Sequence, residues 1–558
     1  MSEQAQAKLS RRKVLGGLAV GAAAVGAATN SCAPQMGAAA QANQKDRPTL
    51  PPLEVVALNR MAFGIAPGDL EAFRALPGAT SREKFVAYVE QQLNPGRIGD
   101  NGCEARLAHL QSLGKGIEQL WRDYYRDVPD SDTKYETIYQ PTNETKFATL
   151  VRAVYSKRQL QEVLADFWHN HFNVSPDRDE RIAPTFAHWD REVIRKHLLG
   201  NFRQMLGAVA THPAMLYYLD NASSNRAGPN ENWARELFEL HTLGAENYLG
   251  VRRQREVSGF AQGQPVGYVD DDIYEATRAF TGWRVNDTTD EPGMNDSGTF
   301  RYHAPGHDRF QKTVLGRYLP PDQAPMKDGT DVLDALAFHP GTARHISRKL
   351  ARRLIGDNPP QSVVDQAARV FLESSKAPDQ LRRVVRTILL SEAFAQTWGD
   401  KIKRPLEAYV SMLRATGAQL NPDKPGDILW QLWQLGQPLF GRIPPDGYPD
   451  FKEAWSGTSS LLERWRWAQG LAGDWWGEAI RSEVAKQTPT RKPREVLDYW
   501  ARRALGRPLA PRSQSAIAAF MGEIRGGNLT EPLSDEDVKW FIPLTVAAVL
   551  SSPDFQWR

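Results

Sequence analysis

The chain has 558 residues, with 69 Lys and Arg against 66 Asp and Glu and a formal net charge of +3. Basic and acidic residues interleave along it, which argues against nucleic-acid binding, because that function usually requires a concentrated basic surface. Only two cysteines are present, Cys32 and Cys103, so we expect neither a disulfide framework nor a thiolate metal cluster. A chain of this length is instead stabilised by a large apolar core.

The first residues predict export. Ser10-Arg11-Arg12-Lys13-Val14-Leu15 precedes a mildly apolar stretch, 14–28, that is rich in Gly and Ala. This pattern is typical of a twin-arginine signal, and the apolar stretch is shorter than the roughly 20 residues that a membrane span needs. We therefore expect the twin-arginine export machinery as a partner, a periplasmic or secreted location, and no transmembrane span in the mature chain.

Two processing sites fit this signal. Ala40-Gln41-Ala42 is an A-x-A cleavage site, whereas cleavage before Cys32 would make a lipoprotein, although Thr29 and Asn30 fit a lipobox poorly. We favour a soluble product. Loss of residues 1–32 removes four basic residues and one acidic residue, which leaves the chain close to neutral. The predicted organisation is a signal and the start of a linker over 1–42, the rest of the linker over 43–52, and a helical region over 53–558.

Helical periodicity dominates the helical region, so the predicted fold class is mainly α. The exception is 299–316, where Thr, Phe, Tyr and Val alternate with Gly and Pro, as in a short hairpin or an active-site loop. Similar sequences, ILLSEAF at 388–394 and VLSSPDF at 549–555, suggest two related helical halves that meet near residue 400. The predicted helices are 53–60, 82–93, 146–168, 190–199, 202–209, 231–243, 272–283, 332–338, 343–354, 362–371, 381–390, 405–415, 461–471, 494–505 and 538–550.

The first candidate site is the sequence Phe-Trp-His-Asn-His-Phe at 167–172. In an ideal helix His169 and His171 would project about 160° apart and would not converge. If the helix ended near Trp168 and the chain became extended, both rings would lie on one face, as metal-binding H-x-H pairs on strands do. Pro176 favours such an end because the residue before proline avoids the helical conformation. In the alternative, His169 and His171 have a purely structural role and bind no metal.

The second candidate site follows about sixty residues later. On a helix that starts at Glu231, Asn232, Arg235, Glu236 and Glu239 share an arc of about 100°, and an apolar face lies opposite. A guanidinium between carboxylates can fix one of them for general-base work or metal ligation. The alternative is a solvated face, on which Arg235 forms ion pairs with Glu231 and Glu239 that contribute a few tenths of a kcal/mol each. His241 lies about 140° from Glu236 on the ideal projection and so is not an easy partner for it.

Other candidates lie outside these two clusters. His307 and Asp308 lie in the non-helical region, where they would either bring an acid or base to a pocket or pack in a plain hairpin. The sequence RKLARR at 348–353 is interpreted as an exposed basic face. DGYPD at 446–450 is interpreted first as a turn, although its exposed Tyr and Asp could bind a sugar or a cation. No phosphate-binding glycine loop, G-x-S-x-G elbow, C-x-x-C-H or H-E-x-x-H motif occurs.

Several of these motifs resemble, in order along the chain, a bacterial family catalogued as domain of unknown function eighteen hundred. The resemblance implies an exported, mostly helical protein, commonly encoded beside a second exported protein of sulfatase-like type. It implies no reaction. The motifs that carry it are LNRMAFG at 58–64, FWHNHF at 167–172, 230–244, FTGW at 280–283, His307-Asp308, 338–350, and 439–449.

Two functions are compatible with the sequence. In the first, the protein is an envelope enzyme, a hydrolase or an oxidoreductase, in which His169, His171 and Glu236 hold a divalent metal ion. The catalytic candidates are then Asn232, Arg235, Glu236, Glu239, His307 and Asp308. A metal-free version uses Glu236 as general acid or base on an envelope polymer. In the second, the protein is a non-catalytic scaffold for the co-exported sulfatase-like protein.

Overall fold

A computed structural model describes residues 49–290 and 293–558, so the predicted signal, its cleavage sites and Cys32 lie outside the described residues. The fold is mainly α, as predicted. No helix within the described ranges is both long and apolar enough to cross a membrane. The first helices are α2 (Leu53–Arg60), α3 (Asp69–Arg74), α4 (Ser81–Gln92), α5 (Asn101–Leu107), α6 (Ile117–Trp121), α7 (Lys134–Tyr155), α8 (Gln159–His171), α9 (Ile182–His188), α10 (Phe202–Thr211), α11 (Pro213–Tyr218), α12 (Asn232–Glu236), α13 (Asp270–Ala279) and α14 (Lys327–Ala337).

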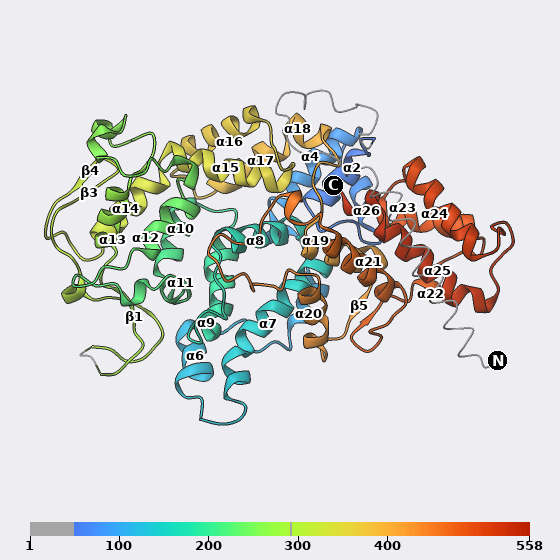
Figure 1. Cartoon of the computed structure of the whole chain (residues 1–558), viewed down its shortest axis with the longest axis horizontal. Coiled ribbons are helices and arrows are strands. Elements are labelled where there is room, and N and C mark those ends of the chain that lie inside the picture. Colours follow the sequence, from blue (N-terminus) through green and yellow to red (C-terminus); the bar gives the residue numbers. More distant parts are fainter. Residues whose placement is uncertain (1–48, 291–292) are drawn as a thin grey trace.

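The second part of the chain continues with helices of similar length. These are α15 (Pro340–Leu354), α16 (Gln361–Glu373), α17 (Gln380–Leu389), α18 (Glu392–Gln396), α19 (Pro405–Thr416), α20 (Pro425–Gln434), α21 (Thr458–Ala472), α22 (Val484–Gln487), α23 (Pro493–Leu505), α24 (Pro511–Ile524), α25 (Asp535–Ser551) and α26 (Pro553–Gln556). Three π-helical segments extend helices: η4 (Arg122–Arg126), η5 (Trp189–Arg195) and η7 (Leu237–His241). Figure 1 shows α8 near the middle of the molecule, with α10–α14 on one side and α19–α25 on the other.

Strands are few and short. Three antiparallel pairs occur among the described residues: β1 (Trp283–Val285) with β2 (Phe300–Tyr302), β3 (Lys312–Val314) with β4 (Arg317–Leu319), and β5 (Gln419–Leu420) with β6 (Ile480–Arg481). The predicted non-helical region therefore contributes strands to two hairpins. The similar sequences near 390 and 550 both lead into short helices, α18 and α26, whose Phe394 and Phe555 are buried. A division into halves near residue 400 stays a prediction.

The predicted helix over 146–168 is wrong, because the chain breaks between α7 and α8. Asp100, at the start of α5, causes the break: its carboxylate accepts hydrogen bonds from Ser156 Oγ at 2.6 Å and from the Lys157 backbone N–H at 2.8 Å. A side chain that binds a backbone N–H competes with helix hydrogen bonds. Helix α8 then starts afresh and runs past Trp168 to His171.

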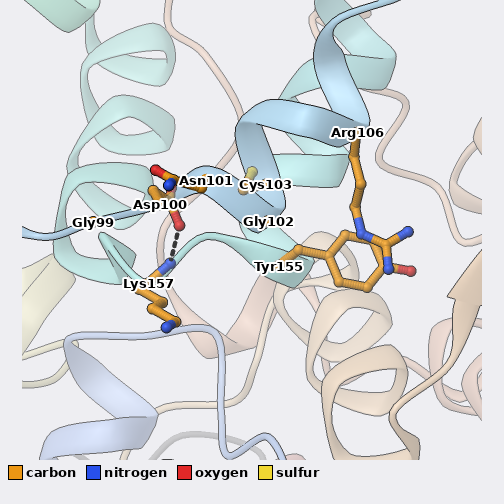
Figure 2. Close-up of a pocket in the computed structure, with 8 residues that line it drawn as sticks. All are labelled: Gly99, Asp100, Asn101, Gly102, Cys103, Arg106, Tyr155 and Lys157. Carbon is orange, nitrogen blue, oxygen red and sulfur yellow. Dashed lines mark hydrogen bonds between the residues drawn. The ribbon is translucent and has the colours of Figure 1, made fainter.

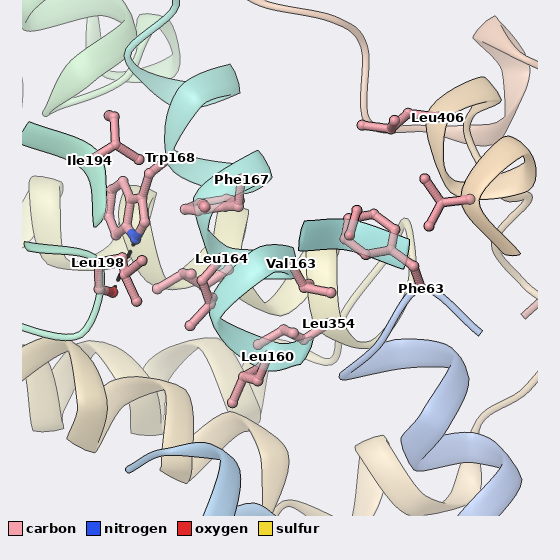
Figure 3. Close-up of a cluster of buried hydrophobic side chains, with 14 of the residues drawn as sticks. Phe63, Leu160, Val163, Leu164, Phe167, Trp168, Ile194, Leu198, Leu354 and Leu406 are labelled. Carbon is pink, nitrogen blue, oxygen red and sulfur yellow. Dashed lines mark hydrogen bonds between the residues drawn. The ribbon is translucent and has the colours of Figure 1, made fainter. Parts of the chain in front are cut away.

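Helix α8 is buried on nearly every side. Its apolar residues pack against segments that are distant in sequence, including Phe63, Leu354 and Leu406 (Figure 3). Trp168 is fully buried, and its indole N–H donates to the Leu198 carbonyl oxygen at 3.2 Å. The charged residues on its other faces, Glu162 and Asp166, form ion pairs with Arg195 and Arg404, so that the helix can lie in the interior. The residues of α8 that belong to the apolar core are Leu160, Val163, Leu164, Ala165, Phe167 and Trp168.

The opposite side of the core is held by a buried ion network around Glu407 on α19. Its carboxylate accepts from Arg353 Nη1 at 2.5 Å and from Arg558 Nη2 at 2.7 Å, and Arg404 contacts both Glu407 and Asp166 of α8. Each of the three arginines is at most 2% exposed. The network therefore joins α8, α15, α19 and the C-terminal residue. The prediction of an exposed basic face over 348–353 is wrong for Arg353. This residue is buried, and the carboxylate of Glu407 balances its charge.

Replacing Glu407 with alanine is expected to lower the free energy of unfolding by about 3–5 kcal/mol, because three guanidinium groups would stay buried without their shared carboxylate. Denaturant unfolding followed by circular dichroism measures this. The matched control is Glu531→Ala, which removes an exposed carboxylate and is expected to change stability by less than about 0.5 kcal/mol. Equal effects of the two substitutions would contradict the role given to the network.

Candidate functional site

His169 and His171 do not converge. Their convergence required the helix to end near Trp168, but α8 continues to His171 and the two rings take different partners. His169 Nε2 donates to Asp190 Oδ1 at 2.9 Å, whereas His171 Nε2 donates to the His241 carbonyl oxygen at 3.2 Å. The predicted pairing of the two histidines on one face is therefore not formed, because the helical twist separates them.

His169 belongs to a buried ion network. Asp190 on η5 also accepts from Arg195 Nε at 2.8 Å, and Arg195 Nη1 in turn contacts Glu162 of α8 at 2.9 Å. Burial alone would raise the pKa of Asp190, but Arg195 and the hydrogen bond from His169 hold that pKa well below its usual range. On its other side the His169 ring packs on Phe440, with centroids 4.5 Å apart. These contacts fix His169 as a structural part of the core.

The predicted second helix changes geometry halfway. The α-helix α12 ends at Glu236, and η7 continues as a π-helix to His241. A projection at 100° per residue therefore fails beyond Glu236, since a π-turn uses i→i+5 hydrogen bonds. His241 becomes fully buried, and its ring centroid lies 6.0 Å from that of His171. The two predicted clusters thus meet through His171 and His241.

Arg235 forms the two i, i+4 ion pairs that are expected of a solvated helix face. Its guanidinium lies 3.3 Å from Glu231 Oε1 and 3.2 Å from Glu239 Oε1. Asn232 is exposed and donates to Asp220 Oδ2 at 3.1 Å. Glu236 is left without a hydrogen-bond or ion-pair partner among the described residues. The polar arc therefore divides into one paired set and one unpaired carboxyl group.

Glu236 is half-buried, and its surroundings favour the protonated form. Burial is the first cause, the nearby carboxylates of Glu239 and Asp446 add to it, and Arg235 opposes it, so that the pKa of Glu236 rises to about 7. Tyr218 lies in the same electrostatic neighbourhood, and its hydroxyl donates to the Ile443 carbonyl oxygen at 2.6 Å. A carboxyl group with a pKa near neutrality is suited to proton transfer.

The segment 442–450, which contains the DGYPD sequence, is fastened to the C-terminal end of α8. The side-chain amide of Asn170 exchanges two hydrogen bonds with the Tyr448 backbone, at 2.7 and 2.8 Å, and Asn173 Nδ2 donates to the carbonyl oxygens of Arg442 and Pro444, each at 2.9 Å. A Cβ on Gly447 would lie 2.2 Å from the Asn170 carbonyl oxygen, so only glycine fits there. This attachment brings Asp446 close to Glu236.

A second group of unpartnered atoms lies near this segment, because Lys349 is an electrostatic neighbour of Asp446 and Asp450. His241 uses neither ring nitrogen in a hydrogen bond, and His171 leaves Nδ1 unused, although both rings are buried. Lys349 on α15 has no hydrogen-bond or ion-pair partner in the described part of the chain. Burial, opposed by Asp450 and helped by Arg352, lowers the pKa of Lys349 to about 8. Unpartnered buried atoms occur at other positions too, such as the indole N–H of Trp283. Here, however, two imidazoles and a partly buried ammonium group lie near one another, which makes the junction a candidate site.

His307 and Asp308 lie in a separate network. His307 Nε2 contacts Asp328 Oδ2 at 3.1 Å, and Lys312 Nζ contacts the same oxygen at 2.7 Å. Asp308 accepts two hydrogen bonds from Arg278, at 2.9 and 3.0 Å. These pairs connect the β3 region to α13 and α14. The polar atoms of His307 and Asp308 that would serve catalysis therefore already have structural partners.

The predicted metal ligands do not fit a metal ion. In the ranges that the structure describes, no group of three or more His, Cys, Asp or Glu side chains is placed to hold one. His169 is taken by Asp190, His171 faces His241, and the electrostatic neighbours of Glu236 are Glu239, Arg235 and Asp446.

Two cavities lie elsewhere, near the start of the helical region. One, of about 470 Å³, is lined by Asp100, Cys103, Arg106, Tyr155 and neighbouring residues, with the Arg106 guanidinium 4.0 Å from the centre of the Tyr155 ring (Figure 2). The other, of about 590 Å³, also has Tyr155 in its wall. Burial raises the pKa of the Cys103 thiol to about 12, which makes it unreactive. None of the predicted site residues lines either cavity.

The sequence predicts no site role for Lys349 or His345. Lys349 is predicted on an exposed basic face, and Asp446 is predicted first in a turn and second as a sugar or cation ligand. Nothing in their local sequence indicates which groups they meet in the fold. The only available signal was that all three lie in the motifs 338–350 and 439–449, which carry the family resemblance.

The fold and this junction define a mostly helical protein whose unpaired acid and base groups gather where α8, η7, α15 and the segment 442–450 meet. The family described as "Protein of unknown function (DUF1800)" matches residues 56–557, nearly the whole chain. The chain belongs to this family. No curated protein and no solved structure matches it.

Glu236→Gln is expected to stabilise the protein at pH 8 and not at pH 4. The folded-state pKa of Glu236, about 7, lies above the unfolded value of 4.5, so ionisation costs stability as the pH rises through that interval. Because the side chain is partly exposed, we expect a gain on the order of 1 kcal/mol at pH 8. Thermal unfolding at both pH values measures it, and Glu231→Gln, which removes only an exposed ion pair, is the control. A gain that is the same at pH 4 would refute the assignment.

Proposed function

We propose that this protein is an exported enzyme that hydrolyses a polymer of the cell envelope, with Glu236 as its general acid–base group. The observation that carries the proposal is the division of the polar arc. Arg235 pairs with Glu231 and Glu239, while Glu236 stays half-buried, unpaired and next to Asp446. A carboxyl group that only contributed to stability would gain from a partner at this position.

The chemistry follows from the two charge states of Glu236. With a pKa near 7, the carboxyl group is protonated in about half of the molecules at neutral pH and can give a proton to a leaving oxygen. Asp446 is paired with Arg442, whose Nη2 lies 2.8 Å from Asp446 Oδ2. Water adds to the other side of the broken bond and loses a proton, and the negative charge of Asp446 favours uptake of that proton by Glu236. Pairs of carboxyl groups in unlike surroundings are a common arrangement for hydrolysis.

Access and location support a large extracellular substrate. Asn232 and Asp446 are exposed beside Glu236, so a polymer can reach the carboxyl group from solvent. A twin-arginine signal at Arg11-Arg12 would supply an export route, which is consistent with a substrate outside the cytoplasm. The alternative, a non-catalytic scaffold for a co-exported sulfatase-like protein, needs no unpaired acid at this position.

Glu236→Gln is expected to reduce hydrolysis by about 100-fold or more, because the amide cannot donate or take up the proton. Purified protein is incubated with isolated cell envelopes, and the soluble fragments released are measured over time. Glu231→Gln, in the same helix region, is expected to keep nearly full activity. If the Glu236→Gln variant releases fragments as fast as the unmodified protein, the scaffold function replaces the catalytic one.

Replacing Arg11 and Arg12 together with lysine is expected to leave the uncleaved precursor inside the cell, because twin-arginine export requires the arginine pair. Cell fractionation followed by immunoblotting detects this. Lys8→Arg serves as the control and should leave export intact. Normal export of the double variant would mean that the location rests on another signal.

A further inference from the structure

One face of α15 carries a row of basic side chains. His345, Lys349 and Arg352 follow one another at i, i+4 and i+7, so they lie on the same side of the helix. The His345 ring centroid is 6.4 Å from that of His171, which places this row against the C-terminal end of α8. His241 completes the surroundings from η7.

The carboxylates near this row are already paired with other cations. Glu246 Oε1 contacts His345 Nδ1 at 3.1 Å and Arg348 Nη1 at 3.2 Å. Asp450 Oδ1 contacts Lys401 Nζ at 2.9 Å, and Asp446 contacts Arg442. Each of these carboxylates therefore already has an ion-pair partner other than Lys349.

Lys349 and Arg352 have no ion-pair partner among the described residues, although Asp450, Glu246 and Asp446 lie near enough to favour the charged form of Lys349. Arg352 Nε donates to the Asp357 carbonyl oxygen at 3.2 Å, and neither residue has a carboxylate partner within the described ranges. Their positive charges lie close enough to influence each other. Two like charges held near each other and partly buried are unfavourable unless an anion joins them.

Two buried histidines beside this row also have ring nitrogens without hydrogen-bond partners. Both nitrogens of His241 and Nδ1 of His171 lack hydrogen-bond partners, although His241 is fully buried. A metal cation would take imidazole nitrogens but would face the Lys349 ammonium group. An oxyanion, in contrast, accepts hydrogen bonds from ammonium, guanidinium and imidazole N–H groups together.

We propose that Lys349 and Arg352, backed by His171 and His241, form a binding site for a tetrahedral oxyanion, that is, a phosphate or sulfate group. Lys349 supplies three donors and Arg352 a planar guanidinium, the groups that proteins use for such anions. The site does not depend on the proposed role of Glu236, whose electrostatic neighbours do not include Lys349.

Isothermal titration of the full exported protein with sodium phosphate, and separately with sodium sulfate, at constant ionic strength tests the proposal. We expect one saturable site for at least one of the two anions. Lys349→Met should weaken the binding by about tenfold or more, since a charge-assisted hydrogen bond is lost, and Arg352→Met should weaken it several-fold. The anion that binds more tightly identifies the group that the natural ligand carries.

Two controls keep the result specific. Arg344→Met removes an exposed cation from another face of the same helix and should leave the affinity unchanged. Glu236→Gln should also leave it unchanged, so that a failure of the hydrolytic function and a failure of the anion site are told apart. Circular dichroism melting checks that each variant folds, and Lys349→Arg, which keeps the charge, should retain binding if Lys349→Met does not fold. Absence of saturable binding for both anions, or equal losses in the Arg344→Met and Lys349→Met variants, would overturn the site.

Discussion

The C-terminal end of α8 is the point on which the rest of the structure depends. Four polar side chains at or just beyond this end of the buried helix bind three different parts of the chain. His169 contacts Asp190, Asn170 and Asn173 hold the segment 442–450, and His171 lies against His241. Because apolar contacts fix the helix itself, these four side chains act as rigid anchors. The position of Asp446 beside Glu236 follows from them.

Buried charges in this protein fall into two kinds. Around Glu407, Asp190 and Asp328 the carboxylates have opposite charges within ion-pair distance, and these networks join helices that are far apart in sequence. At the junction of α8, η7 and α15, in contrast, Glu236, Lys349 and the nitrogens of His241 have no partners within the described ranges. Every carboxylate of the first kind has a cationic partner, although guanidinium nitrogens of Arg353, Arg558 and Arg195 have none. The proposed oxyanion would supply partners to Lys349 and His241 of the second kind.

The π-helical segment η7 has a direct consequence for the site. An α-helix continued through 237–241 would put His241 about 140° from Glu236. The wider turn instead lets Glu236 stay near the surface while His241 enters the core next to His171. Such π-turns inside helices are frequent at functional sites because they change side-chain directions locally. Here one turn separates an acid that faces solvent from an imidazole that faces the basic row of α15.

The sequence by itself determined the fold class and most of the helices, since a repeating apolar stripe reports directly which face of a helix is buried. It also located both polar clusters and the Arg235 ion pairs, because contacts between i and i+4 depend only on helix geometry. Tertiary structure decided the rest. The break before α8 and the burial of Arg353 depend on groups tens of residues away in sequence, namely Asp100 and Glu407. Local periodicity carries no information about which of these distant groups a side chain meets. For that reason the candidate site contains the unpaired side chains of Glu236 and Lys349, and not the predicted pair of histidines on one face.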